Sequence, residues 1–204
     1  MRITIIGGSQ GTGAQLATLA RGAGHDVTVL SRSGRAPEGV RPLTGDATDP
    51  ATVREAVDGA DAVVVTVGAA KGVHHQRTAV TRAVVGAMQG SGPRRLLVQS
   101  SLGAGDSARQ LPGVLRPVMK LVLARPLADH DEQESLVRAS GLDWTIVRPS
   151  GLTDRPATGR WQRLTTDQEG TLRGTITRED LARCMLEVLQ DDATIGRALG
   201  VSGA

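Results

Sequence analysis

The sequence predicts one α/β domain, in which helices cover both faces of a mainly parallel, doubly wound sheet. Short runs rich in β-branched residues alternate with helical patterns along the 204 residues. The run at residues 62–67 is apolar almost without interruption, which is typical of a parallel strand buried on both faces. The first such run leads directly into a glycine-rich loop. The length fits a single domain at residues 1–204, and no repeat or linker divides it.

The expected strands and helices follow one another along the chain. We expect strands at residues 1–6, 25–30, 40–43, 62–67, 95–100 and 144–148. We expect helices at residues 14–20, 51–57, 73–89 and 177–189. In the last helix, Thr177 and Asp180 resemble a capping box, and an apolar stripe at helical spacing follows them. That stripe includes Cys184, which we therefore interpret as a buried structural thiol and not as a nucleophile.

The loop after the first strand is the most informative part of the chain. Residues 7–13 read GGSQGTG and lie between an apolar strand and a helix. Glycines permit positive φ and let backbone N–H groups approach an anion, and the helix adds unpaired amides and the positive end of its dipole. No lysine follows, which disfavours a P-loop, and the glycines fit the looser G-x-x-x-G-x-G spacing. The loop predicts a nucleotide bound by a Rossmann-like domain; the alternative is an ordinary tight turn.

The end of the second strand indicates which nucleotide binds. Residues 31–35 read SRSGR, where NAD-binding proteins usually have an acidic residue that accepts from the ribose hydroxyls. Arg32 and Arg35 are able to clamp the additional phosphate of NADP. The sequence therefore favours NADP over NAD as the cofactor. The alternative is that both arginines are solvated loop charges.

Composition excludes several other classes of protein. The calculated pI is near 9.9 but the formal charge is only +3, and the basic residues are scattered along the chain. Without a polybasic run or aromatic stacking platform, we expect no nucleic-acid binding. No apolar stretch is long enough to span a membrane, and a single cysteine indicates a cytoplasmic protein. His74 and His75 lack partners at ligand spacing, so we expect an exposed pair at a helix start and no metal site.

Five segments of the chain resemble a known family. They are residues 7–13, 28–32, 45–49, 100–101 and 140–149. Together they resemble the atypical short-chain dehydrogenases/reductases with an NAD(P)H-binding domain, a group that includes NmrA-like proteins and flavin reductases of the biliverdin reductase B type. The resemblance covers essentially the whole chain.

The resemblance implies a role for each matching position. It implies that the glycine loop binds the diphosphate, that Arg32 binds the 2′-phosphate, and that the ends of the following strands contact adenine, ribose and nicotinamide. The implied cofactor contacts are Gly7, Ser9, Gln10, Gly11, Thr12, Gly13, Arg32, Asp46, Ala47, Thr66, Val67, Gly68, Ala69, Ser100, Pro149 and Leu152. Ser101 lies where nicotinamide and substrate are expected to meet.

The chain also departs from the family pattern. Typical members use a tyrosine and lysine pair for acid–base catalysis, but this chain contains no tyrosine. His130 lies near the usual lysine position, within the acidic segment 128–134. Two interpretations stay open: neighbouring carboxylates raise the pKa of His130 and make it a proton donor, or it is a surface histidine in the first turn of a helix. Gly151 stands where the flavin reductases have a histidine, so that substrate contact is lost.

These observations favour an NADPH-dependent reductase that transfers hydride to a planar acceptor such as a flavin, a quinone or a biliverdin-like tetrapyrrole. Hydride transfer to flavin N5 needs no tyrosine, because solvent supplies the remaining proton. Ser101 and His130 are the candidate catalytic residues. The alternative is a non-catalytic, NmrA-like sensor of NADP redox state. The expected partners are a small-molecule substrate and, at most, a second copy in a homodimer.

Two segments are expected on the substrate side, at about residues 102–126 and 150–177. The first carries an apolar helical stripe formed by Val114, Leu115, Val118, Met119 and Val122, between prolines. One interpretation is a lid or wall over an apolar substrate. The other is a helix packed against the sheet edge or a partner subunit.

Overall fold

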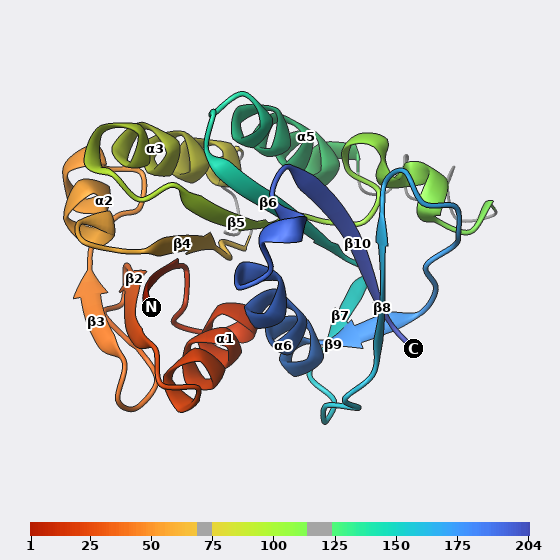
Figure 1. Ribbon diagram of the computed structural model, residues 1–204, viewed down its shortest axis with the longest axis horizontal. Coiled ribbons are helices and arrows are strands. Elements are labelled where there is room, and N and C mark those ends of the chain that lie inside the picture. The colour runs from red at the N-terminus through yellow and green to blue at the C-terminus, as the bar shows by residue number, and fades with distance from the viewer. Residues whose placement is uncertain (69–74, 114–123) are drawn as a thin grey trace.

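The main sheet has the strand order expected of a doubly wound α/β domain. In the computed structural model, which describes residues 1–68, 75–113 and 124–204, eight strands form one sheet in the order β3-β2-β1-β4-β5-β6-β10-β8 (Figure 1). All neighbours pair in parallel except β8, which is antiparallel to β10. These strands are β1 (Arg2–Ile6), β2 (Asp26–Ser31), β3 (Arg41–Thr44), β4 (Ala62–Val65), β5 (Arg95–Gln99), β6 (Asp143–Pro149), β8 (Trp161–Thr165) and β10 (Arg197–Gly203). The predicted fold class is confirmed.

Helices cover both faces of this sheet. Figure 1 shows α2 (Pro50–Val57), α3 (Gln76–Ser91) and α5 (Ala124–Arg138) along one face, and α1 (Gly11–Gly22) and α6 (Arg178–Leu189) on the other. Each face has its own buried cluster of aliphatic side chains, one with residues of α1 and α6 and one with residues of α2, α3 and α5. Because the strands are covered on both sides, all four residues of β4 are buried, as its apolar sequence predicts.

The strand order determines where a ligand-binding crevice lies. From β1 the chain continues outward to β2 and β3, and then returns to β4 on the other side of β1. This reversal leaves a crevice at the carboxyl ends of β1 and β4, where ligands bind in open α/β sheets. A separate parallel pair, β7 (Gly151–Thr153) with β9 (Thr175–Thr177), lies beyond β6 in the chain.

Several boundaries differ from the sequence prediction. Strand β4 ends at Val65 instead of residue 67, and α3 begins at Gln76. Strand β10 was not predicted, because residues 197–203 include Gly200 and Gly203. A Cβ on Gly200 would overlap the side chains of Gln110 and Leu172, so this glycine permits close packing within a strand. Residues 114–123, with the predicted apolar stripe, lie outside the described residues.

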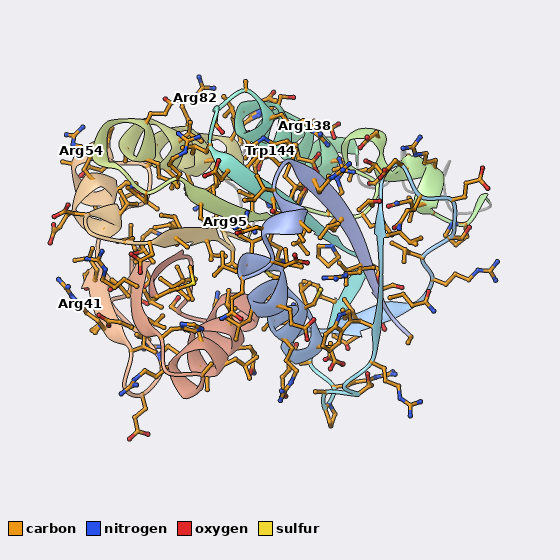
Figure 2. All side chains as sticks on the ribbon, viewed as in Figure 1. Arg41, Arg54, Arg82, Arg95, Arg138 and Trp144 are labelled. Carbon is orange, nitrogen blue, oxygen red and sulfur yellow. The ribbon has the colours of Figure 1, made fainter. Side chains whose placement is uncertain are left out.

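A buried arginine joins β5 to the end of α6. Arg95 donates from Nη2 to the Val188 carbonyl at 2.7 Å and from Nε to the Leu189 carbonyl at 3.2 Å. It also binds Thr194 Oγ1 at 3.1 Å and Thr145 Oγ1 at 2.8 Å. Figure 2 shows Arg95 near the centre of the molecule, whereas the exposed Arg41, Arg54 and Arg82 lie at its margin. Arg95 therefore satisfies helix carbonyls that have no partner within the helix.

Replacing Arg95 by alanine is expected to lower the free energy of unfolding by roughly 3 kcal/mol, because buried carbonyl and hydroxyl groups lose a charged donor. The adjacent Arg94 is the control: its side chain is 63% exposed and pairs with Asp143 at 3.3 Å. Arg94→Ala is expected to cost about 1 kcal/mol or less. Urea unfolding of both variants measures the difference, and equal losses would contradict this role of Arg95.

Candidate functional site

Two cavities meet at the carboxyl edge of the sheet. The first has a volume of about 540 Å³ and lies against the glycine loop, the ends of β2 and β4, and the start of α6. The second, of about 520 Å³, lies at the ends of β5 and β6 and extends toward η1 (Gly105–Gln110) and the segment before β9. Among the residues that the structure describes, four line both cavities: Val67, Gly68, Gln99 and Leu152. Ligands bound in the two cavities would therefore meet above β4 and β5.

The glycine loop has the geometry of a phosphate cradle. Gly7 and Gly11 have φ of 92° and 59°, a region that favours glycine. Gln10 precedes α1 with extended backbone, and its side chain makes no cap, so it leaves the first amides of the helix to a ligand. Gly13 has a different role, because a Cβ there would lie 2.8 Å from the Gly7 carbonyl oxygen and from the Gly8 Cα. Gly13 lets α1 approach the loop and does not line the cavity.

One of the two predicted arginines lies at the first cavity. Arg32 lines it, together with Asp46 and Ala47. Arg35 is exposed outside the lining, and its carbonyl accepts from Ser31 Oγ at 3.2 Å. The Asp46 carboxylate accepts from the Thr48 amide and hydroxyl, each at 2.9 Å, and these bonds lower the pKa of Asp46. Asp46 is thus an ionised acceptor at this end of the cavity.

Most of the predicted cofactor residues lie together. Those that line the first cavity are Gly7, Ser9, Gln10, Gly11, Thr12, Arg32, Asp46, Ala47, Thr66, Val67, Gly68 and Leu152. Ser100 and Pro149 line the second cavity instead. Gly13 and Arg35 line neither, and Ala69 lies outside the described residues.

The second cavity combines apolar walls with a polar floor. Its walls include the buried side chains of Leu102, Leu111 and Leu172. Both candidate catalytic residues, Ser101 and His130, also line it. The Ser101 hydroxyl makes only a long bond of 3.4 Å to the carbonyl of Leu102. Ser101 is therefore only weakly engaged, and among the described hydroxyls of this lining only Ser150 Oγ, which is buried without a hydrogen-bond partner, is engaged less.

His130 differs from both expectations. It is only 6% exposed and lies two turns into α5, so it is not a surface residue in a first helical turn. Its Nδ1 lies 3.3 Å from Ser100 Oγ and 3.3 Å from Gln133 Oε1. Burial and the charge of Arg77 lower the pKa of His130 to about 4, against the expectation of a raised value. The imidazole is neutral at pH 7.

Asp129 and Glu134 act to raise the pKa of His130, but burial and the charge of Arg77 outweigh them, and each of these two carboxylates has a cationic partner of its own. Asp129 pairs with Arg77 at 3.3 Å. Glu134 accepts from Arg148 Nε at 2.8 Å and also binds Nη2 at 2.5 Å. Burial opposes the charge of Arg148, but Glu134 and Asp106 outweigh it and raise its pKa. The negative charge around His130 is thereby compensated, and desolvation dominates.

The same ion pair orients a serine at the cavity. Ser100 Oγ donates to Glu134 Oε1 at 2.7 Å, and Arg148, which is fully buried, holds that carboxylate from the other side. Arg148 Nη1 lies 2.7 Å from Asp106 Oδ1. The proton of Ser100 thus points to Glu134, and Ser100 faces the cavity as a hydrogen-bond acceptor.

Sequence reasoning missed several polar residues of the two linings, among them Gln99, Arg77 and Arg178. Gln99 ends β5 and lines both cavities, and its Oε1 is buried without a hydrogen-bond partner. Arg77 lines the second cavity and Arg178 the first. A polar residue that ends an apolar strand was the available signal for Gln99. The two arginines reach the cavities through tertiary packing, which the sequence pattern does not report.

Two further expectations concern residues away from the cavities. Cys184 is fully buried in α6, and burial raises the pKa of its thiol to about 12, which confirms the structural thiol. His75 is exposed at the N-cap of α3, as expected, with Nδ1 3.2 Å from Glu132 Oε2. His74 lies outside the described residues. Among the helices described, none combines the length and apolar character needed to cross a membrane.

The fold and the first cavity define a nucleotide-binding protein of the Rossmann class. Residues 7–192 match the family described as NAD(P)H-binding, and the chain belongs to this family. It is 24% identical to an uncharacterized sugar epimerase, YhfK, of Bacillus subtilis, over 99% of this chain and 94% of that protein. It also resembles a yeast protein, YMR090W of Saccharomyces cerevisiae, at 30% identity over 73% of this chain and 65% of the yeast protein.

Solved structures support the same assignment. ChuY of Escherichia coli O157:H7, described as an anaerobillin reductase, superposes with a TM-score of 0.84 at 27% identity, over 100% of this chain and 97% of ChuY. A short-chain dehydrogenase/reductase of Veillonella parvula in complex with NADP has the same fold, with a TM-score of 0.83 at 20% identity over 98% and 94% of the two chains. The chain is thus an NAD(P)H-binding protein with an oxidoreductase fold.

The buried neutral His130 is expected to make the fold sensitive to mild acid. The pKa of His130 is about 4 in the folded protein, against the ordinary histidine value of 6.5 in the unfolded chain. Above pH 6.5 neither state binds the proton, so stability is retained; as the pH falls toward 4, the unfolded state binds it first and stability is lost. This loss amounts to roughly 3 kcal/mol between pH 7 and pH 4. Urea unfolding across this range measures it.

His130→Gln is the matched variant, because an amide keeps hydrogen-bonding groups at the site but does not titrate. Its free energy of unfolding is expected to fall less between pH 7 and pH 4 than that of the native chain. Parallel pH profiles for the two proteins would contradict a depressed pKa at His130.

Proposed function

We propose that this protein is an NADPH-dependent reductase that transfers hydride to a planar acceptor such as a flavin, a quinone or a biliverdin-like tetrapyrrole. The observation that carries the proposal is the junction of the two cavities at Val67, Gly68, Gln99 and Leu152. A nicotinamide at this junction would face an acceptor in the second cavity. Direct hydride transfer requires such contact between donor and acceptor.

The residues of the first cavity fit a dinucleotide. The positive φ angles at Gly7 and Gly11 leave an uncapped helix start for the diphosphate. Arg32 provides a guanidinium at the end of β2, and Ser31 and Ser33 stand beside it where NAD-binding proteins usually have an acidic residue. When bound, NADPH supplies the hydride. Gln99 supports this fit as a polar residue of the junction lining, because its Oε1 has no hydrogen-bond partner within the described part of the chain.

The second cavity supports an acceptor that needs little acid catalysis. The chain has no tyrosine, and His130 is neutral at pH 7. Leucine side chains on its walls complement an apolar ring, and the Ser101 hydroxyl is available to donate to a carbonyl of the acceptor. The similarity to ChuY, named as an anaerobillin reductase, supports an acceptor of the tetrapyrrole type. The chain has no tyrosine that could act as the acid in an epimerisation.

Oxidation of NADPH with a panel of acceptors tests this function. We expect turnover with at least one of FMN, riboflavin, simple quinones and biliverdin. The loss of NADPH absorbance measures this turnover. Leu111→Trp is the matched variant, because Leu111 lines only the second cavity. It is expected to raise the KM for the acceptor at least several-fold and to leave the Kd for NADPH unchanged.

Absence of turnover with the whole panel, while both cofactor forms bind, would contradict the reductase. A redox sensor would then be favoured only if NADPH and NADP⁺ bind with clearly different affinities. Equal affinities would support neither role.

Arg32→Ala tests the preference for NADPH. Loss of a charged hydrogen bond to the 2′-phosphate is expected to weaken NADPH binding by roughly 1.5 to 3 kcal/mol, with little effect on NADH. Arg35→Ala is the control, because Arg35 is exposed and lines neither cavity. Calorimetric titration with both cofactors compares the variants. Equal weakening of NADPH and NADH by Arg32→Ala would refute the assignment.

A further inference from the structure

The lining of the first cavity contains a second arginine besides Arg32. Arg178 is the first residue of α6, far from the glycine loop in the sequence. A Cβ built on Gly11 would lie 3.5 Å from Arg178 Nε and 3.7 Å from its Cδ. The guanidinium therefore lies against the first residue of α1, beside the loop that forms the phosphate cradle. Within the described lining, these two arginines are the cationic side chains.

A single exposed carboxylate holds Arg178 in place. Its Nη1 donates to Asp154 Oδ1 at 2.8 Å. The side chain of Asp154 is 85% exposed, whereas that of Arg178 is 30% exposed. Topology explains the pairing, because Thr153 and Thr177 are register partners at the ends of β7 and β9. The residues that follow these two strands, Asp154 and Arg178, consequently lie side by side.

We propose that Arg178 is a ligand of the cofactor's diphosphate and that the diphosphate replaces Asp154 as its anionic partner. This inference rests on the proposed dinucleotide site. A guanidinium presents a planar fork of donors that matches phosphate oxygens, and a diphosphate carries more negative charge than one carboxylate. An exposed ion pair is weak, so releasing Asp154 costs little. Asp154 itself lines the cavity and would repel a bound diphosphate while it stays there.

Opposite effects of the two partners are the signature of this exchange. Arg178→Ala is expected to weaken NADPH and NADH alike, by about tenfold, since both carry the diphosphate. Asp154→Asn is expected to tighten both about threefold, because it removes a competitor and a repulsive charge. A purely structural ion pair would give changes of the same sign in both variants. Isothermal titration calorimetry with each cofactor measures these changes.

Fragments and a control variant localise the effect. Binding of 2′-AMP, which lacks a diphosphate, is expected to be unchanged by Arg178→Ala when followed by NMR titration. Arg183→Ala is the matched control on the same helix, because Arg183 pairs with Glu179 at 2.7 Å and does not line the first cavity. It is expected to bind both cofactors as the native chain does.

Three results would overturn the inference. The first is that Arg178→Ala binds NADPH and NADH as tightly as Arg183→Ala does. The second is that Asp154→Asn binds the two cofactors more weakly than the native chain. The third is that Arg178→Ala also weakens the binding of 2′-AMP. Thermal unfolding of each variant distinguishes a folding defect from a binding defect, and Asp154→Asn keeps the test valid if Arg178→Ala is unstable. If the native chain binds no pyridine nucleotide, the proposed cofactor site itself is wrong. If the native chain binds NADPH and NADH, and Arg178→Ala binds them equally well, only the diphosphate contact of Arg178 is refuted.

Discussion

The close approach of α1 to the ends of β1 and β4 is the constraint on which the rest of the site depends. It requires glycine at two positions: a Cβ on Gly7 would lie 3.2 Å from the backbone of Val67, and a Cβ on Gly13 would meet the loop backbone. Thr66, where β4 has ended, donates from its hydroxyl to the Ile6 carbonyl at 3.3 Å. Larger residues would push the helix outward and move its first amides away from the crevice. Arg32 and Arg178 can contact a nucleotide in the first cavity only because the glycine loop leaves room for its diphosphate.

Compensated charge on α5 determines the chemistry of the second cavity. Asp129 and Glu134 are nearly buried, and an ion pair with Arg77 or Arg148 offsets the cost of desolvating each of them. At His130, which lies between these pairs, burial and the charge of Arg77 outweigh the two carboxylates, so the imidazole stays neutral. The polar floor can thus hydrogen-bond a ligand, but it offers no strong acid at neutral pH. That property suits an acceptor whose reduction does not depend on a proton from the protein.

The sequence predicted the parts of the site that depend on local signals. The glycine loop, the buried run in β4 and the cap at Thr177 all reflect neighbours a few residues apart, and the structure confirms them. His130 was misjudged because its pKa is lowered by burial and, after that, by the charge of Arg77, more than fifty residues away in the chain. Arg178 was missed for a similar reason, since the register of β7 and β9 brings it to the first cavity, whereas Gln99 had a local signal as the polar residue that ends β5. Periodicity identifies a buried face but does not identify which distant side chain meets it.

The two cavities differ in what they recognise, and this difference has a consequence for selectivity. The first presents fixed cations and backbone amides, which complement the charged and invariant parts of a dinucleotide. The second presents leucine walls beside its polar groups, and these walls recognise the apolar part of a ligand mainly by shape. Shape alone rejects related planar molecules weakly, because a missing or additional apolar group changes binding by only about 1–3 kcal/mol. An enzyme built in this way would hold one cofactor firmly and accept a range of flat substrates, with the reduction potential of the acceptor contributing as much to selectivity as the protein does.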